Sequence, residues 1–149
     1  MSGVHPGERG DWAYIPAFTF ALALFAAVAL ALDAEAVALG HARLWSATAL
    51  GARAGARCLL GSPSNGQGVA AAQACVASVA STLVPENLRS DGLSPQTTRA
   101  SVTSQDSVQV TATADMTLPL PLPGSPAVVS LTADATALLL PSVTTATAS

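Results

Sequence analysis

Charged residues are scarce in this sequence, and lysine is absent altogether. Only 10% of the 149 residues are charged, whereas about 25% is typical of soluble globular proteins. The six basic residues are all arginines and lie scattered, so the chain lacks the basic stripe typical of nucleic-acid binding. Intrinsic disorder is disfavoured as well, because half of the residues are hydrophobic and the net charge is only −3.

The residues that carry most enzyme chemistry are few and far apart. Two histidines, His5 and His41, and two cysteines, Cys58 and Cys75, show none of the spacings that bind zinc. The sequence contains neither a Gly-x-Ser-x-Gly elbow nor a glycine-rich phosphate loop. We therefore expect a protein that is not an enzyme and that binds no metal, cofactor or small-molecule substrate.

The chain has instead one long apolar run near its start. Residues 12–32 contain no charge, and a helix of about 20 such residues crosses a bilayer. Trp12 and Tyr14 begin the run, where aromatic rings favour the headgroup layer. We predict a transmembrane helix over residues 12–32 after a leader over residues 1–11. A cleaved signal peptide is the alternative, although its apolar region is normally shorter and its leader positively charged.

Helix-forming residues continue beyond the apolar run. Residues 33–60 are rich in alanine, leucine and arginine and lack proline, so the helix is predicted to continue outside the membrane. A Gly-Ser-Pro-Ser-Asn-Gly cluster then ends it. Residues 67–84 have an apolar face at helical spacing and are followed by Pro85, which predicts a second helix ending there.

The spacing of apolar residues changes in the last third of the chain. After a predicted loop over residues 87–98, residues 99–140 contain segments in which apolar and polar side chains alternate, as half-buried strands require. A proline-rich stretch between these segments lacks the amide donors of a regular ladder. We predict an α+β fold with a long N-terminal helix, a second helix and a small antiparallel β-sheet of two or three strands. Residues 141–149 are predicted to form a tail.

Two further patterns concern packing. Ala47, Gly51 and Gly55 form a stripe of small residues, which permits close approach between helices or merely reflects the abundance of alanine. Cys58 and Cys75 are predicted to form a disulfide, which stabilises by about 3 kcal/mol for a loop of this size and fits an extracytoplasmic domain. Two unpaired cysteines that fill small apolar gaps are the alternative.

The order of these segments resembles the TadE-like minor pilins, or pseudopilins, of tight-adherence (Flp, type IVb) pilus systems. Three stretches carry the resemblance: Glu8-Arg9-Gly10 before the apolar run, the Ala/Arg/Gly-rich residues 47–57, and the Val-x-Val-x-Ala strand at 108–112 with the Leu-Pro connection and alternating strand after it. The resemblance implies a pilin-like fold and a structural role in pilus assembly. It also implies a location in the bacterial cell membrane or a surface filament, with other pilins and pilus assembly proteins as partners.

The resemblance further implies processing and orientation. Cleavage after Gly10 by a prepilin peptidase would give a mature chain that begins at Asp11, whose fifth residue is Ile15 where many pilins have glutamate. The family topology places the N-terminus in the cytoplasm and the C-terminal domain outside. A single-pass membrane-anchored envelope protein with an extracytoplasmic interaction module is the alternative function.

Overall fold

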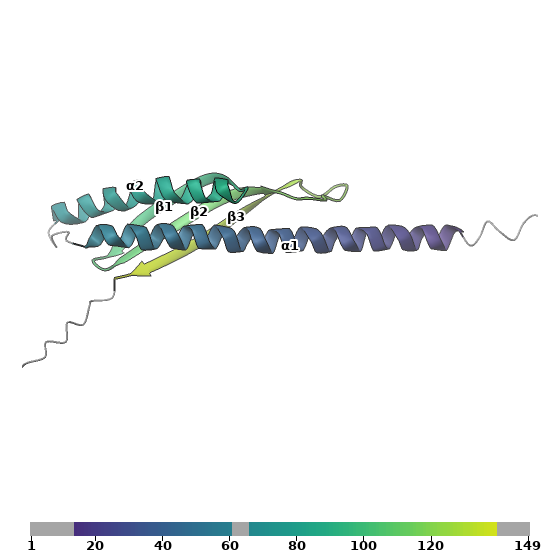
Figure 1. The fold of residues 1–149 in the computed structure, drawn as a ribbon, viewed down its shortest axis with the longest axis horizontal. Coiled ribbons are helices and arrows are strands. Elements are labelled where there is room, and N and C mark those ends of the chain that lie inside the picture. The colour runs from purple at the N-terminus through teal and green to yellow at the C-terminus, as the bar shows by residue number, and fades with distance from the viewer. Residues whose placement is uncertain (1–13, 61–65, 140–149) are drawn as a thin grey trace, which may run out of the picture.

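The structure is a computed structural model that describes residues 14–60 and 66–139 (Figure 1). Its elements, in chain order, are α1 (Tyr14–Ala56), a short 3-10 helix (Arg57–Leu59), α2 (Gly66–Ser90), β1 (Ser94–Ser104), β2 (Ser107–Thr117) and β3 (Val128–Leu138). The predicted α+β class is confirmed, and the antiparallel sheet has three strands. The predicted leader and tail, including Gly10 and Asp11, lie outside the described residues.

Helix α1 runs without interruption for 43 residues, or about 65 Å at 1.5 Å per residue. Figure 1 shows that the other elements cover only its C-terminal part, so the molecule consists of a bare helix and a folded head. The predicted boundary between residues 32 and 33 therefore lies within one continuous helix, near the point where the other elements begin to pack against it. No break of the backbone marks it.

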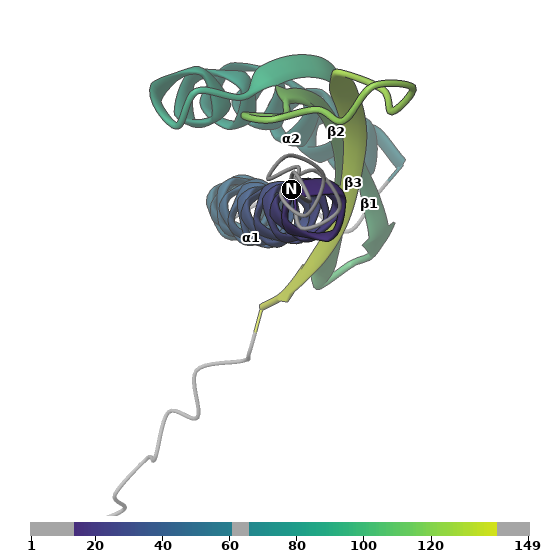
Figure 2. The same cartoon turned by 90° about the vertical axis from the view of Figure 1, so that its right-hand side faces the viewer.

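The head is a three-stranded sheet with both helices on one face. The strand order is β1-β2-β3, each neighbouring pair antiparallel, so β2 is central. Figure 2 shows α1 and α2 on the same side of the sheet, where α2 packs mainly against β1, and α1 packs against β2 and β3. Alternate residues of β2 point toward the helices, which is why its sequence alternates apolar with polar side chains.

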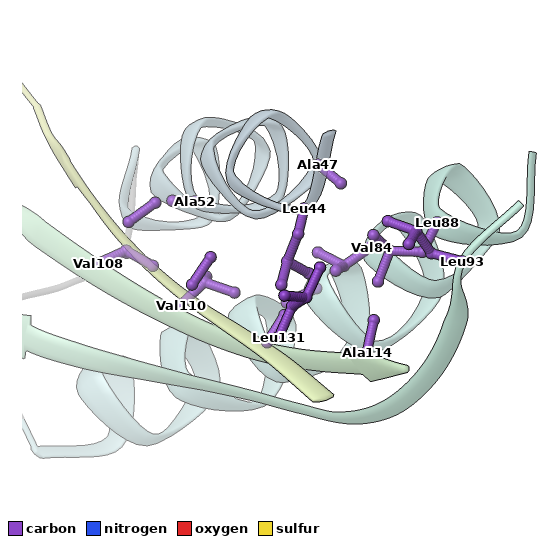
Figure 3. Packing of buried hydrophobic residues seen from close by; sticks show 14 of the residues in the cluster. Leu44, Ala47, Ala52, Val84, Leu88, Leu93, Val108, Val110, Ala114 and Leu131 are labelled. Atoms are coloured by element: carbon purple, nitrogen blue, oxygen red, sulfur yellow. The ribbon is translucent and has the colours of Figure 1, made fainter. Parts of the chain in front are cut away.

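The core lies between the helices and the central strand (Figure 3). Leu44 of α1, Leu88 of α2 and Val110 of β2 are completely buried there. Thr48 is a polar residue that the described fold buries completely, and its hydroxyl donates to the Leu44 carbonyl oxygen at 2.7 Å. Because that hydroxyl is satisfied within its own helix, burying it leaves no unpaired polar atom.

The second helix does not end at Val84, as predicted, but continues through Pro85 to Ser90. Val84 and Leu88 on either side of the proline are completely buried, so core packing holds the helix together across it. The carbonyl that loses its amide partner belongs to Ser81, which lies on the exposed face, where water can replace the lost hydrogen bond. Tertiary packing therefore outweighs the local effect of the proline.

The helix ends instead in a Schellman motif at Gly92, which has a φ of 77°. The Leu93 amide donates to the Leu88 carbonyl oxygen at 2.9 Å, and the Gly92 amide donates to that of Arg89 at 3.2 Å. Leu93 is itself buried against the core. Strand β1 follows immediately, so the predicted loop over residues 87–98 is wrong.

Strand β1 begins at Ser94, five residues before the predicted start of the β module at residue 99. Pro95 lies inside it, which an edge strand tolerates because one row of its amides faces away from the ladder. The register also shifts between Pro95 and Thr97, so the pairing accommodates the proline locally.

Candidate functional site

The N-terminal half of α1, residues 14–32, carries a large exposed apolar surface, and we call it the stem. Every residue from Tyr14 to Phe25 is exposed, which covers more than three turns and therefore all sides of the helix. Phe18 and Phe20 are 66% and 70% exposed. A helix that is apolar all round needs a core or a membrane around it, and the other described elements supply no core around residues 14–25.

Two helices in the described part of the chain are long and apolar enough to cross a membrane, but their surroundings differ. Only 6% of the most apolar window in Tyr14–Leu59 is buried within the fold, against 28% in Gln67–Ser90. The second helix contributes Val84 and Leu88 to the core, so its apolar face is already used. The stem is about 28 Å long, close to the roughly 30 Å of a bilayer's hydrocarbon core. Its length and composition are compatible with a membrane anchor.

Thr19, a polar residue within the stem, has its hydroxyl satisfied by its own helix. The Thr19 hydroxyl lies within hydrogen-bonding distance of the carbonyl oxygens of Ile15 and Pro16, at 3.1 and 3.0 Å. Pro16 lies in the first turn of α1, where the missing amide hydrogen would have no helical partner. A lipid environment requires this kind of internal satisfaction, because it offers no water to unpaired groups.

The head meets the stem at Asp33, the first charged residue after the apolar run. Asp33 is buried, and its Oδ1 accepts a hydrogen bond from the backbone amide of Leu120 at 3.1 Å. Leu120 belongs to the β2–β3 loop, residues 118–127, which lies along α1 on the side of the stem (Figure 1). The carboxylate thus fastens the loop to the helix where the head begins.

Replacing Asp33 with alanine is expected to release the β2–β3 loop. A hydrogen bond to a charged group contributes about 1.5–3 kcal/mol, and its loss leaves the Leu120 amide unpaired. Hydrogen–deuterium exchange of residues 118–127 should therefore accelerate in Asp33→Ala. Asp33→Asn keeps an oxygen acceptor and is the matched control, for which exchange should stay close to that of the unaltered chain. Equal exchange in all three proteins would contradict a role for this contact.

The stripe of Ala47, Gly51 and Gly55 lies inside the head, with all three residues buried. A Cβ atom built on Gly51 would lie 2.5 Å from Cγ2 of Val84 in α2. On Gly55 it would lie 3.2 Å from Cγ1 of Val76, also in α2. The stripe therefore allows α1 to approach the second helix of its own chain. Within the described residues it is not a free surface for another subunit.

A fourth small residue of α1, Gly40, was missed from the sequence. A Cβ there would lie 2.6 Å from the sulfur of Met116 and 3.1 Å from Cδ1 of Leu131, at the end of the sheet nearest the stem. Gly40 lies seven residues before Ala47 and so shares its helix face. The seven-residue spacing between Gly40 and Ala47 is the signal that would place Gly40 in the stripe. Leu44, a large residue between them, interrupts the series of small side chains.

The two cysteines are joined by a disulfide in the structure, with 5.9 Å between the Cα atoms of Cys58 and Cys75. Cys58 lies in the 3-10 helix that follows α1, and Cys75 lies in α2. The bond therefore ties together the two helices at the end of the head remote from the stem (Figure 1).

Gln73 links α2 to β1 through hydrogen bonds, a contact that the sequence did not reveal. Its Nε2 donates to the Ala100 carbonyl oxygen at 2.8 Å, and its Oε1 accepts from the Val102 amide at 2.7 Å. The side-chain amide of α2 thus pairs with the outer edge of β1 as a neighbouring strand would. Covering backbone groups in this way makes an edge strand less available to other chains.

The scattered acidic residues do not form a catalytic arrangement among the described residues. Asp115 accepts hydrogen bonds from Gln96 and Ser130 on the two neighbouring strands, and Asp134 accepts one from Thr111. These carboxylates link strands across the sheet. His41 lies on the exposed side of α1.

Comparison with known proteins adds no relative: no family model, curated protein or solved structure matches this chain.

Proposed function

We propose that this protein is a structural subunit of a type IV (Tad/Flp) pilus, a TadE-like minor pilin anchored by its N-terminal helix. The observation that carries the proposal is that one unbroken helix, α1, forms the stem and also packs into the core of the head. Its first half is exposed and apolar, and its second half supplies Leu44 and Thr48 to the core of the head. A helix of this kind fixes the head rigidly to whatever surrounds the stem.

The proposed orientation rests on the disulfide. Disulfides persist in oxidising compartments, so the head with Cys58 and Cys75 belongs outside the cytoplasm and the N-terminus inside. Arginines lie on both sides of the stem, Arg9 before it and Arg43 after it, so charge favours neither orientation. The proposed partners are the membrane, other pilins, pilus assembly proteins and a prepilin peptidase.

The first experiment is the intact mass of the protein extracted from its native membranes. We expect a mature chain that begins at Asp11, because prepilin-type cleavage follows a glycine and Gly10 precedes the apolar run. Gly10→Leu is the matched control and should retain the leader. A chain that still begins near Met1 would favour the alternative, a single-pass envelope protein with an extracytoplasmic interaction module. A chain that begins near Asp33 would indicate a cleaved signal peptide.

A second readout separates a pilus component from another envelope protein. Surface filaments sheared from cells should contain the protein or depend on it, so deletion of its gene should reduce their amount. The unaltered chain should restore them, and Gly10→Leu should not. Filaments that are unaffected by deletion and lack the protein would contradict the pilus proposal while leaving membrane anchoring intact.

A further inference from the structure

The β2–β3 loop, residues 118–127, has an unusual surface for a loop. It contains four prolines and three leucines, and no charged residue occurs between Asp115 and Asp134. Leu120 is 41% exposed, and Pro119, Pro121 and Pro123 are exposed beside it. Loops normally present polar groups to water, so an exposed apolar loop indicates contact with a non-aqueous partner.

The loop also lies where the stem emerges from the head. The Leu120 amide binds Asp33, and Leu122, farther along the loop, shares a shallow groove of about 400 Å³ with Leu30 of the stem. Figure 1 shows the loop extending along α1 past the end of the sheet, toward the N-terminus. The loop therefore reaches beyond the first charged residue of α1 and alongside the last turn of the apolar segment.

The backbone of the loop is unusually free of unpaired donors. Four of its ten residues are prolines, which have no amide hydrogen. Three more amides donate within the molecule: Leu118 to Ala127, Ser125 to Leu122, and Leu120 to Asp33. The Ser125 hydroxyl also donates to the Leu122 carbonyl oxygen, at 2.8 Å. Few unpaired donors lower the cost of moving this segment from water into the interfacial layer, where its carbonyl oxygens can still accept hydrogen bonds from water.

We propose that the β2–β3 loop rests in the interfacial layer of the bilayer beside the stem, as a second membrane contact of the head. The partner is lipid, with Leu120 and the exposed prolines against the upper acyl chains and Asp33 shielded behind the loop. The inference rests on the proposed anchoring of the stem. Because the loop and the stem contact the membrane together, the head is held at a fixed depth and in one orientation about the helix axis.

Quenching of tryptophan emission by brominated lipid tests the inference. The full chain is placed in phosphatidylcholine vesicles whose acyl chains carry bromine near the headgroup, with Trp12 and Trp45 replaced by phenylalanine. Leu120→Trp then reports on the loop and Phe20→Trp on the stem. Gln105→Trp, in the exposed β1–β2 turn at the opposite end of the sheet, is the matched control. We expect the loss of emission for Leu120→Trp to be several-fold greater than for Gln105→Trp.

The other outcomes separate the two proposals. If Phe20→Trp is quenched and Leu120→Trp is quenched no more than Gln105→Trp, the stem is in lipid and the inference about the loop is overturned. If Phe20→Trp is not quenched either, the anchoring itself fails. An unquenched Leu120→Trp whose emission shifts to the blue as the protein-to-lipid ratio rises would show that a second copy covers the loop, which also overturns the inference.

Discussion

Gly51→Leu is expected to lower the free energy of unfolding of the head by about 3 kcal/mol, at the upper end of the usual cost of overpacking a core. The Cβ alone would lie 2.5 Å from Cγ2 of Val84, and the leucine adds three more carbons in the same direction. Val84 is completely buried and β-branched, so it cannot rotate away. The helices must separate to admit the new side chain.

Urea unfolding of the full chain in mild detergent, followed by circular dichroism, measures this effect. Ala42→Leu, on the exposed face of α1, adds a similar side chain and should change stability by less than about 0.5 kcal/mol. Val84→Ala removes the atom that meets the new Cβ, so the Gly51→Ala/Val84→Ala pair should lose less stability than the sum of the single variants. Additive losses, or a Gly51→Leu protein as stable as the Ala42→Leu control, would mean that the helices do not approach here.

Reduction of the disulfide between Cys58 and Cys75 is expected to lower stability by about 3 kcal/mol, from the chain entropy that a closed loop of this size removes. The bond spans a sequence separation of 17 residues and joins the 3-10 helix after α1 to the first half of α2. Without it, the two helices lose their covalent link at this end, where packing around Gly55 remains. The loss should therefore appear first as faster amide exchange near the remote end of the head.

The Cys58→Ser/Cys75→Ser double variant tests the disulfide. Its urea midpoint should match that of the reduced natural chain and should not respond to dithiothreitol, whereas the midpoint of the oxidised chain should fall on reduction. Alkylation of both thiols in the unreduced protein, with equal mobility on reducing and non-reducing gels, would contradict the bond.

Patterns within single elements were readable from the sequence. The length of α1 follows from its composition, and the sheet follows from the alternation in residues such as Val108 and Val110. The end of α2 differs from the prediction because Pro85 does not stop the helix, which ends just before Asp91-Gly92-Leu93. That triplet carries the signal of a Schellman motif, a glycine followed by an apolar residue that packs back on the helix.

Contacts between distant elements could not be read in the same way. Asp33 and Leu120 are 87 residues apart, and Gln73 lies 27 residues from Ala100, so no local spacing links them. Small residues such as Gly51 show that something approaches α1 closely. They do not show whether the partner is another helix of the same chain or a neighbouring subunit. That distinction depends on the complete fold.

The position of α1 in the fold also sets the order in which the molecule can form. Among the described elements α1 is synthesised first, whereas β3, which packs against it, is synthesised last. Chains are synthesised at about 5–20 residues per second, so several seconds pass before the strands that cover the head-facing side of α1 have been made. Much of that side consists of Ala47, Gly51, Ala52, Gly55 and Ala56. A nascent helix with so little bulky apolar surface on this side is a poor target for premature association, so the small residues that permit close packing also protect the unfinished chain.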